Sequence, residues 1–496
     1  MFLTFSIVIC AIYVIWIMAR QRRRMVVLDP PALPGKLPLL GHAYILYGNN
    51  QHTWNVLKWI SQETLAKGGV ITMNIGPHLA YAITDPDDCY TVANTCLQKD
   101  YFYNFAKPWL GNGLVTGSGP IWKRHRKLLN PTFNQQVLNG FVGVFNNQAR
   151  VLMAQLSAKV GKGPFVPLKY ISESSLGTVF REYFLFVPIL LGFNCNLFYP
   201  GMVMQIQKIF TERFQKFWLH VDIIYNMTKL KAKQDKQIKL LHKLSNMVCI
   251  ILTWYLTFTS ISLNGWAEPF LDFLLELSKG DGVISDQEIR EEVDTFIIAG
   301  HDTTSYVLIY TLIAIGSYPE VQEKIFEELQ DLVGGSGRDI TKHDLHKLVY
   351  LEAVIKESIR LYPIAPIISR YADTEVKLKN YTIPSGCSIF LLYWGMHHHS
   401  LWGPDAADFK PERWLDPAKL PANSNVFAGF SIGKRNCIGK TFAMMSMKTT
   451  LAHLIRQYRI NADISKMTLR IDVMLKPDIG NVISLDLRRP INNFGG

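Results

Sequence analysis

Residues 430–439 read Phe-Ser-Ile-Gly-Lys-Arg-Asn-Cys-Ile-Gly and place one cysteine in a loop between glycines. Gly433 and Gly439 lack side chains, so backbone N–H groups can approach the sulfur of Cys437 and keep a thiolate ionised. A helical pattern begins directly after the loop, and its positive end faces the sulfur. Arg435 can pair with an anionic group of the same ligand. The loop therefore predicts a thiolate that holds a metal, whereas a lone cysteine is by default a buried free thiol.

The composition indicates a large domain in a reducing compartment. Of the 496 residues, 48% are apolar, which is enough for a large core. The seven cysteines are odd in number and include no Cys-x-x-Cys pair, which argues against a disulfide scaffold. The net charge is +12, and basic residues cluster at 20–24 and 123–127. Since no nucleic-acid motif accompanies this charge, we expect no nucleic-acid partner but an anionic membrane surface or an acidic protein.

The N-terminus has the pattern of a membrane anchor. Residues 2–19 carry no charge and are just long enough to span a bilayer, and the first basic cluster follows at once. The positive-inside rule then places the remaining chain in the cytosol. A cleaved signal peptide is the weaker alternative, because no basic segment precedes the apolar run. The predicted organisation is an anchor at residues 1–19, a basic and proline-rich linker at 20–41 and a catalytic domain at 42–496.

The catalytic domain is predicted to be mainly helical with a minor β-sheet. Residues 70–84 alternate around a Gly-Pro pair and predict a hairpin, and helical periodicity dominates from about residue 121. Thr341 and Asp344 have the spacing of a capping box. Further short strands are expected within residues 367–378, 381–391 and 469–487.

Residues 293–304 form an apolar helical segment that is interrupted by Gly300 and by the acid–alcohol pair Asp302-Thr303. Such groups in the middle of a helix cost stability unless something compensates. One interpretation is a helix bend in which Thr303 bonds to the preceding turn. The other is a notch at which the pair supplies protons to bound oxygen.

The cysteine loop follows the order Phe-x-x-Gly-x-Arg-x-Cys-x-Gly, which resembles the haem-binding loop of the cytochromes P-450, the haem-thiolate monooxygenases. The matching residues are Phe430, Gly433, Arg435, Cys437 and Gly439. The resemblance implies the cytochrome P-450 fold, with haem between a long central helix and the cysteine loop. Cys437 would be the axial iron ligand, whose electron donation favours O–O cleavage. Five matches at fixed spacing make this motif specific.

Two further motifs are similar to those of the same family. The segment from Ala299 resembles its Ala-Gly-x-Asp-Thr sequence, which implies that Asp302 and Thr303 deliver protons during O2 activation. Trp122-x-x-x-Arg126 places two N–H donors on one helix face, and the resemblance implies that they bond a haem propionate. The full set implied to bind the cofactor is Trp122, Arg126, Arg370, Phe430, Gly433, Arg435 and Gly439.

Glu357 and Arg360 lie three residues apart on a predicted helix. An isolated pair would be a surface salt bridge worth less than ~1 kcal/mol. The resemblance implies instead that the pair joins Arg413, from a Pro-Glu-Arg segment, in a buried network that sets the fold of the haem pocket.

Residues 109–114, 122–133 and 292–304 look like family 4 of the cytochromes P-450, which includes fatty-acid ω-hydroxylases and many insect enzymes. Many members of that family esterify the haem through a glutamate at the position of Ala299. Alanine cannot form an ester, so we expect haem b that is held without a covalent bond.

The resemblance implies a monooxygenase of the endoplasmic reticulum membrane whose catalytic domain faces the cytosol. It would insert one atom of O2 into an apolar substrate (a fatty acid, another lipid or a xenobiotic). Electrons would come from NADPH through NADPH–cytochrome reductase, with cytochrome b5 as a further candidate donor, docked by charge steering on a basic ridge. The ridge comprises Lys123, Arg124, Lys127, Lys434 and Lys440. The substrate-facing candidates are Phe105, Leu114, Phe296, Ile297, Ile364, Ala365 and Ile367.

Two uncharged stretches, 183–207 and 249–267, do not follow the family pattern. They would be membrane-contacting segments, additional membrane spans or a gene-model error. The gene-model error leads to one alternative function, a non-catalytic or misfolded paralogue. The other alternative is a haem-thiolate isomerase or dehydratase that needs no reductase. Asp302-Thr303 argues against it, because such enzymes need no proton delivery to O2.

Overall fold

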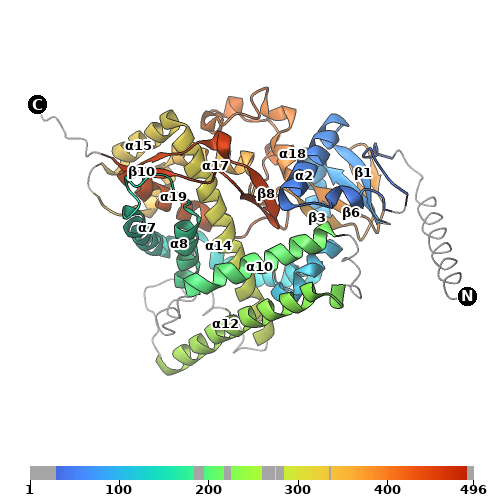
Figure 1. Cartoon of the computed structure of the whole chain (residues 1–496), viewed down its shortest axis with the longest axis horizontal. Coiled ribbons are helices and arrows are strands. Elements are labelled where there is room, and N and C mark those ends of the chain that lie inside the picture. The colour runs from blue at the N-terminus through green and yellow to red at the C-terminus, as the bar shows by residue number, and fades with distance from the viewer. Residues whose placement is uncertain are drawn as a thin grey trace, which may run out of the picture.

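The computed structural model describes residues 29–38, 40–76, 78–183, 195–216, 225–259, 274, 284–334 and 337–488. The predicted anchor and much of the predicted linker lie outside these residues. Helices form most of the described chain, and a small sheet lies at one end of the molecule (Figure 1). The prediction of a mainly helical chain with a minor sheet is therefore confirmed.

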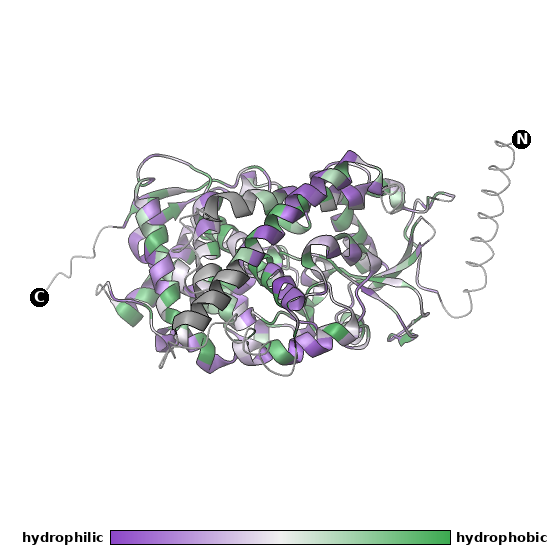
Figure 2. Cartoon of the chain, turned by 90° about the horizontal axis from the view of Figure 1, so that it is seen from below, coloured by the Kyte–Doolittle hydropathy of each residue, from purple (hydrophilic) through white to green (hydrophobic). Residues whose placement is uncertain are grey.

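Most of the described helices bury one face and expose the other. Hydrophilic and hydrophobic residues are interleaved along most of them (Figure 2), as expected for amphipathic helices around a core. The α-helices are α2 (Asn50–Ala66), α3 (Pro86–Thr95), α4 (Lys107–Leu110), α5 (Gly119–Leu129), α6 (Gln135–Gly140), α7 (Val142–Ser157), α8 (Leu168–Tyr183), α10 (Cys195–Gln215), α12 (Lys229–Thr259), α14 (Asp286–Ser317), α15 (Pro319–Val333), α16 (Lys342–Lys347), α17 (Val349–Leu361), α18 (Tyr393–His397) and α19 (Lys440–Gln457).

Helix α14 is the central element of the fold. It begins at a capping box, in which the Ser285 hydroxyl accepts the N–H of Glu288 and the Glu288 carboxylate accepts the N–H of Ser285. It packs against α8, α12 and α17 and runs through the middle of the molecule (Figure 1). Among the described residues it is the one helix long and apolar enough to cross a membrane, and 83% of its apolar window is buried. Burial inside the protein accounts for its apolar sequence.

The two uncharged stretches are described only in part. Residues 195–207 belong to α10 and residues 249–259 to α12, so these parts are helical. Neither helix, as far as it is described, is apolar enough over its length to be a candidate membrane span. The described parts therefore give no support to additional spans. Residues 184–194 and 260–267 lie outside the described chain.

The main sheet has four strands in the order β1-β2-β6-β3. β1 (Val70–Ile75) and β2 (His78–Ile83) are antiparallel, with Val70 opposite Ile83, which confirms the predicted hairpin. β2 is parallel to β6 (Ser388–Leu391), and β6 is antiparallel to β3 (Ile368–Tyr371). The two-stranded sheets are β4 (Val376–Lys377) with β5 (Thr382–Ile383), β8 (Leu469–Asp472) with β9 (Met474–Pro477), and β7 (Tyr458–Asn461) with β10 (Ser484–Leu487).

Every strand except β7 falls within a range predicted to contain strands. β7 follows α19 directly, and the polar residues Arg459 and Asn461 alternate with Tyr458 and Ile460. Four residues are too few for a reliable period-2 pattern, and the pairing partner β10 supplies the structure instead. The predicted capping box at Thr341 and Asp344 is confirmed.

The predicted network of Glu357, Arg360 and Arg413 is present and buried. Arg360 donates to both oxygens of Glu357 at 2.8 Å and to three backbone carbonyls. Glu357 also accepts from Arg413 Nε at 3.0 Å and from Trp414 Nε1 at 3.0 Å. The network thus joins α17 to the segment that precedes the cysteine loop, and its buried charges are satisfied.

We predict that Glu357→Ala lowers the free energy of unfolding by about 3–5 kcal/mol, because it leaves the buried guanidinium of Arg360 without a carboxylate and removes one of the two carboxylates that pair with Arg413. Denaturant unfolding measures this change. Lys466→Ala, which removes an exposed ion pair, serves as the control and should leave the transition midpoint nearly unchanged. Equal effects of the two substitutions would contradict the structural role of the network.

Candidate functional site

The cysteine loop has a backbone that requires glycine. Gly433 has a φ of 72°, and a Cβ at this position would lie 2.7 Å from both the Cβ and the carbonyl oxygen of Ala93. The N–H of Cys437 donates to the carbonyl of Phe430 at 2.9 Å, which closes the loop. Helix α19 then begins, with Gly439 as its N-cap and no side chain capping it. The first amides of α19 are therefore free to face the sulfur.

The environment of Cys437 combines burial with groups that favour a thiolate. Burial raises the pKa of its thiol, while the Gly439 N–H, Arg126 and Lys440 oppose that rise. The residue is nevertheless exposed to solvent. The raised pKa and the solvent exposure both fit a side chain that is surrounded by protein atoms but open to solvent on one side. A metal that approached on that side would meet a sulfur with a backbone donor and positive charge nearby.

Three cations lie together near the cysteine loop. Burial lowers the pKa of Lys99 well below its usual range, and Arg370 and Arg435 lower it further. Burial and the nearby Arg370 also lower the pKa of Arg435 to about 9. Neither Lys99 nor the two arginines have a carboxylate partner among the residues that the structure describes, and the buried Nε of Arg370 has no hydrogen-bond partner there. This cluster matches a ligand with carboxylate groups.

Helix α5 joins the cysteine loop through Trp122 and Arg126. Arg126 donates to the backbone oxygen of Asn436 at 2.7 Å and to its side-chain oxygen at 3.1 Å. The guanidinium of Arg435 lies 5.0 Å from the centre of the Trp122 ring. The structure therefore brings both α5 residues to the loop. Their predicted bonds to a propionate stay predictions.

The acid–alcohol pair of α14 has two different environments. The Thr303 hydroxyl donates to the carbonyl of Ala299 at 2.5 Å, which is the local bond expected for a bent helix. Asp302 is buried, and its carboxylate accepts from Gln207 Nε2 of α10 at 2.7 Å. Gln207 in turn accepts from the buried amino group of Lys476 on β9. Asp302 is thus oriented by a chain of side chains that the sequence did not indicate.

The predicted substrate-facing residues are mostly buried, but Ala365 is exposed. Phe296 of α14 stacks on Phe133 with ring centres 5.5 Å apart. Phe133 is also the nearest side chain to a Cβ at Gly439, at 3.9 Å. An aromatic contact therefore links the central helix to the start of α19.

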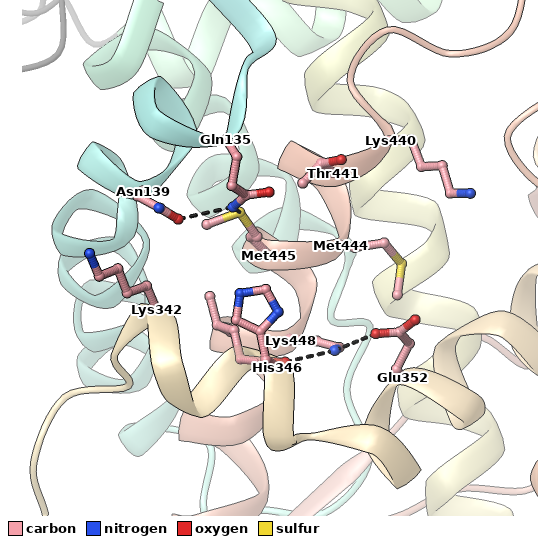
Figure 3. Close-up of a pocket in the computed structure, with 11 residues that line it drawn as sticks. Gln135, Asn139, Lys342, His346, Glu352, Lys440, Thr441, Met444, Met445 and Lys448 are labelled. Carbon is pink, nitrogen blue, oxygen red and sulfur yellow. Dashed lines mark hydrogen bonds and ion pairs between the residues drawn. The ribbon is translucent and has the colours of Figure 1, made fainter. Parts of the chain in front are cut away.

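A separate polar cavity of about 200 Å³ opens beside α19 (Figure 3). It is lined from α6, α16, α17 and α19. In the close-up, Lys448 reaches Glu352, and Gln135 donates to Asn139 at 2.9 Å. Lys342 and Lys440 lie at its edges, so the cavity extends the positive surface near the cysteine loop.

The donor set fits a haem. One cysteine supplies a single thiolate, and the cation cluster suits the two carboxylates of the porphyrin. Within the described residues no group of three or more His, Cys, Asp or Glu side chains could hold a metal ion by itself. A metal at Cys437 would thus need most of its ligands from a cofactor, as in haem-thiolate proteins.

Comparisons with known proteins agree with this site. A family model for cytochrome P450 matches residues 30–480. Cytochrome P450 4V2 of Mus musculus is 31% identical over 472 residues, which cover 92% of this chain and 90% of the relative. Cytochrome P450 4c21 of Blattella germanica is 31% identical over 475 residues, which cover 92% and 93% of the two chains. Cytochrome P450 4c3 of Drosophila melanogaster is 29% identical over 492 residues, covering 95% and 92%.

The chain belongs to the cytochrome P450 family, so it is a haem-thiolate monooxygenase with the fold of that family. The relatives named above carry family 4 names, and two of them come from insects. The predictions of the family, of the family 4 type and of the enzyme class are confirmed.

Lys99 is the cofactor-binding candidate that the sequence reasoning did not single out. It stands alone between Gln98 and Asp100, with no motif around it. Only the fold, which brings it to Arg370 and Arg435, distinguishes it from a solvated lysine.

We predict that Gly433→Ala destabilises the protein by at least about 2 kcal/mol, because alanine meets both a left-handed backbone and Ala93. The bound haem should fall in parallel, as measured by absorbance per mole of protein. Gly143→Ala in α7 is the matched control, since nothing lies within 4 Å of its Cβ. Helix propensity makes this control neutral or slightly stabilising. Full haem occupancy in Gly433→Ala would contradict the account of the loop.

Proposed function

We propose that this protein inserts one oxygen atom into an apolar substrate, such as a fatty acid, another lipid or a xenobiotic, with electrons from NADPH through NADPH–cytochrome reductase. The observation that carries the proposal is that a solvent-exposed thiol, Cys437, occurs in the same loop region as the cation cluster of Lys99, Arg370 and Arg435. Bound haem would supply the activation of O2. The largely apolar set of candidates around α14 favours an apolar substrate.

In this proposal the residues of the loop have separate tasks. Cys437 is the metal ligand, and the Gly439 N–H stabilises its charge. Gly433 and the Phe430 carbonyl give the loop its shape. The cofactor carboxylates are held by Trp122, Arg126, Arg370 and Arg435, with Lys99 as an addition to the predicted set.

Asp302 and Thr303 are proposed to hold and pass protons for O2 activation. The hydroxyl of Thr303 donates its hydrogen to the carbonyl of Ala299, and its oxygen can still accept a hydrogen bond from a proton donor. One oxygen of Asp302 is bound by Gln207, which fixes the orientation of the carboxylate. A carboxylate and a hydroxyl in adjacent positions can relay a proton through water.

The haem is proposed to be held without a covalent bond. Ala299 has no group that can form an ester. The cation cluster and the thiolate would then supply the whole attachment. Organic extraction of the acidified holoenzyme should remove all the haem, and haem that stays with the polypeptide would contradict this part of the proposal.

The reductase is proposed to dock on the basic ridge, and cytochrome b5 would use the same face. All five ridge residues are exposed, and Arg124 pairs with Glu288 of α14. Lys440 also belongs to the polar cavity of Figure 3, so ridge and cavity form one positive surface. Such a surface attracts an acidic protein and loses affinity as salt rises.

The domain organisation and location are proposed from the sequence. Residues 1–19 would anchor the chain in the endoplasmic reticulum membrane, residues 20–41 would be the linker, and residues 42–496 would form the catalytic domain in the cytosol. The charge pattern after residue 19 supports this orientation.

We predict that the reduced, carbon-monoxide-bound holoenzyme shows a strongly red-shifted Soret band, because thiolate ligation changes the electronics of the iron. Cys437→Ser should abolish the shift. Cys387→Ser changes a buried cysteine directly before β6 and should keep the shift. A wild-type band at the ordinary histidine-haem position would refute the proposed ligand.

We predict that Asp302→Asn lowers product formation about 10²-fold with reductase and NADPH present, while NADPH oxidation falls much less, because proton delivery fails. The ratio of product to NADPH consumed is the measurement. Asp463→Asn, an exposed change that keeps a capping oxygen, is the control. Turnover of a peroxide without NADPH, unaffected by Asp302→Asn, would favour the isomerase or dehydratase alternative.

A further inference from the structure

The segment of residues 109–117, which begins in the last turn of α4 and continues as a loop, is held from two sides at Leu114. Its backbone N–H donates to Glu292 Oε2 of α14 at 3.2 Å. Its backbone carbonyl accepts from Arg435 of the cysteine loop at 3.1 Å, and the carbonyl of Gly117 accepts from the same guanidinium nitrogen at 3.0 Å. One residue of this loop therefore connects the central helix to the loop that carries Cys437.

The same segment lies closely against α14. The N–H of Asn112 donates to Glu291 Oε2 at 2.8 Å. A Cβ on Gly111 would lie 2.0 Å from the carboxyl carbon of Glu291, and a Cβ on Gly113 would lie 2.2 Å from the Thr295 hydroxyl. Because these two glycines have no side chain, the backbone of the segment can approach α14 closely. The positions of the α14 carboxylates then determine where the segment lies.

Glu292 is fully buried, so the charge of its carboxylate must be balanced by a cation or neutralised by a proton. The partner is His125 of α5, which is also fully buried. Its Nδ1 lies 2.6 Å from Glu292 Oε1, and its Nε2 lies 3.3 Å from Glu288 Oε1. Arg124 contacts both Glu288 and the His125 ring. His125 thus sits between two carboxylates of α14.

We propose that His125 is a positioning residue whose bond to Glu292 fixes Leu114, and through the Leu114 carbonyl fixes Arg435 beside the cysteine loop. Glu292 uses one oxygen for the histidine and the other for the Leu114 N–H. The histidine of α5 therefore orients the Glu292 carboxylate, and that carboxylate orients the loop. The link from His125 to haem binding rests on the proposed function. The link from His125 to the position of the Leu114 loop does not depend on it.

The first test is hydrogen exchange of residues 109–117 in the holoenzyme. His125→Phe keeps a ring but loses both bonds to carboxylates, so these amides should exchange at least about tenfold faster than in wild type. His125→Gln can donate to one carboxylate but carries no charge, and its exchange should fall between the two. His343→Phe replaces an exposed histidine of α16 and should match wild type. Unchanged exchange in both His125 variants would overturn the proposal.

The second test uses pH to separate positioning from simple packing. Burial raises the pKa of Glu292, and hydrogen bonds to Glu292 and Glu288 raise that of His125 against its own burial. A carboxyl with a raised folded-state pKa stabilises the fold while it is protonated and loses that contribution as pH rises through the raised value. Arg124, Glu288 and Glu291 are the other charged groups that face this pair.

In His125→Phe the Glu292 carboxyl has lost its hydrogen-bond partner on α5. Retention of haem and the order of residues 109–117 should then fall with rising pH more steeply than in wild type. Adding Glu292→Gln to His125→Phe should remove that extra pH dependence while leaving an acceptor for the Leu114 N–H. An extra pH step that persists in the double variant would overturn the proposal. Failure of the wild-type Soret shift would instead refute the proposed function, and the exchange result would still decide the positioning role of His125.

Discussion

Buried positive charge beside the cysteine loop is the constraint on which the site depends. Arg370 and Arg435 lower the pKa of Lys99, Arg370 lowers that of Arg435, and no carboxylate of the described chain pairs with the three cations. Desolvated cations of like charge are costly unless negative charge joins them. The carboxylates of a porphyrin would supply that charge. Because a ligand that binds only the folded state stabilises it, cofactor binding and stability of this region are one equilibrium.

Arg435 transmits this dependence to the rest of the pocket. Its guanidinium donates to the carbonyls of Leu97, Leu114 and Gly117, so three positions outside the cysteine loop share one cation. Removing Arg435 would leave these carbonyls without their donor, and in the holoenzyme it would leave a carboxylate of the cofactor without its partner. By contrast, the network of Glu357 joins α17 to the segment that precedes the cysteine loop and pairs its buried charges within the protein. The region therefore contains two charged groups of residues. The Glu357 network pairs its charges within the protein, whereas the cation cluster needs the negative charge of a ligand.

The sequence predicted the parts of this site that depend on local spacing. The cysteine loop and the hairpin of β1 and β2 each contain a short motif whose geometry follows from neighbouring residues, whereas the Glu357 network was expected from the family resemblance. Lys99 and Lys476 carry no such signal, because their importance comes from burial next to residues hundreds of positions away. His125 lay inside a recognised basic stretch. Only the packing of α5 on α14 separates it from the solvated lysines around it.

The segment of residues 109–117 lies between opposite charges, and its backbone groups contact both of them. On one side stand the carboxylates of Glu291 and Glu292, which receive N–H groups. On the other side lies Arg435, whose guanidinium donates to the carbonyls of Leu114 and Gly117. Each backbone group thus faces the charge that attracts it, and both charges are buried where such bonds are strong. A change in either charge should therefore be felt at the other through the loop, so substitutions at Glu292 and Arg435 should not be additive in their effect on stability.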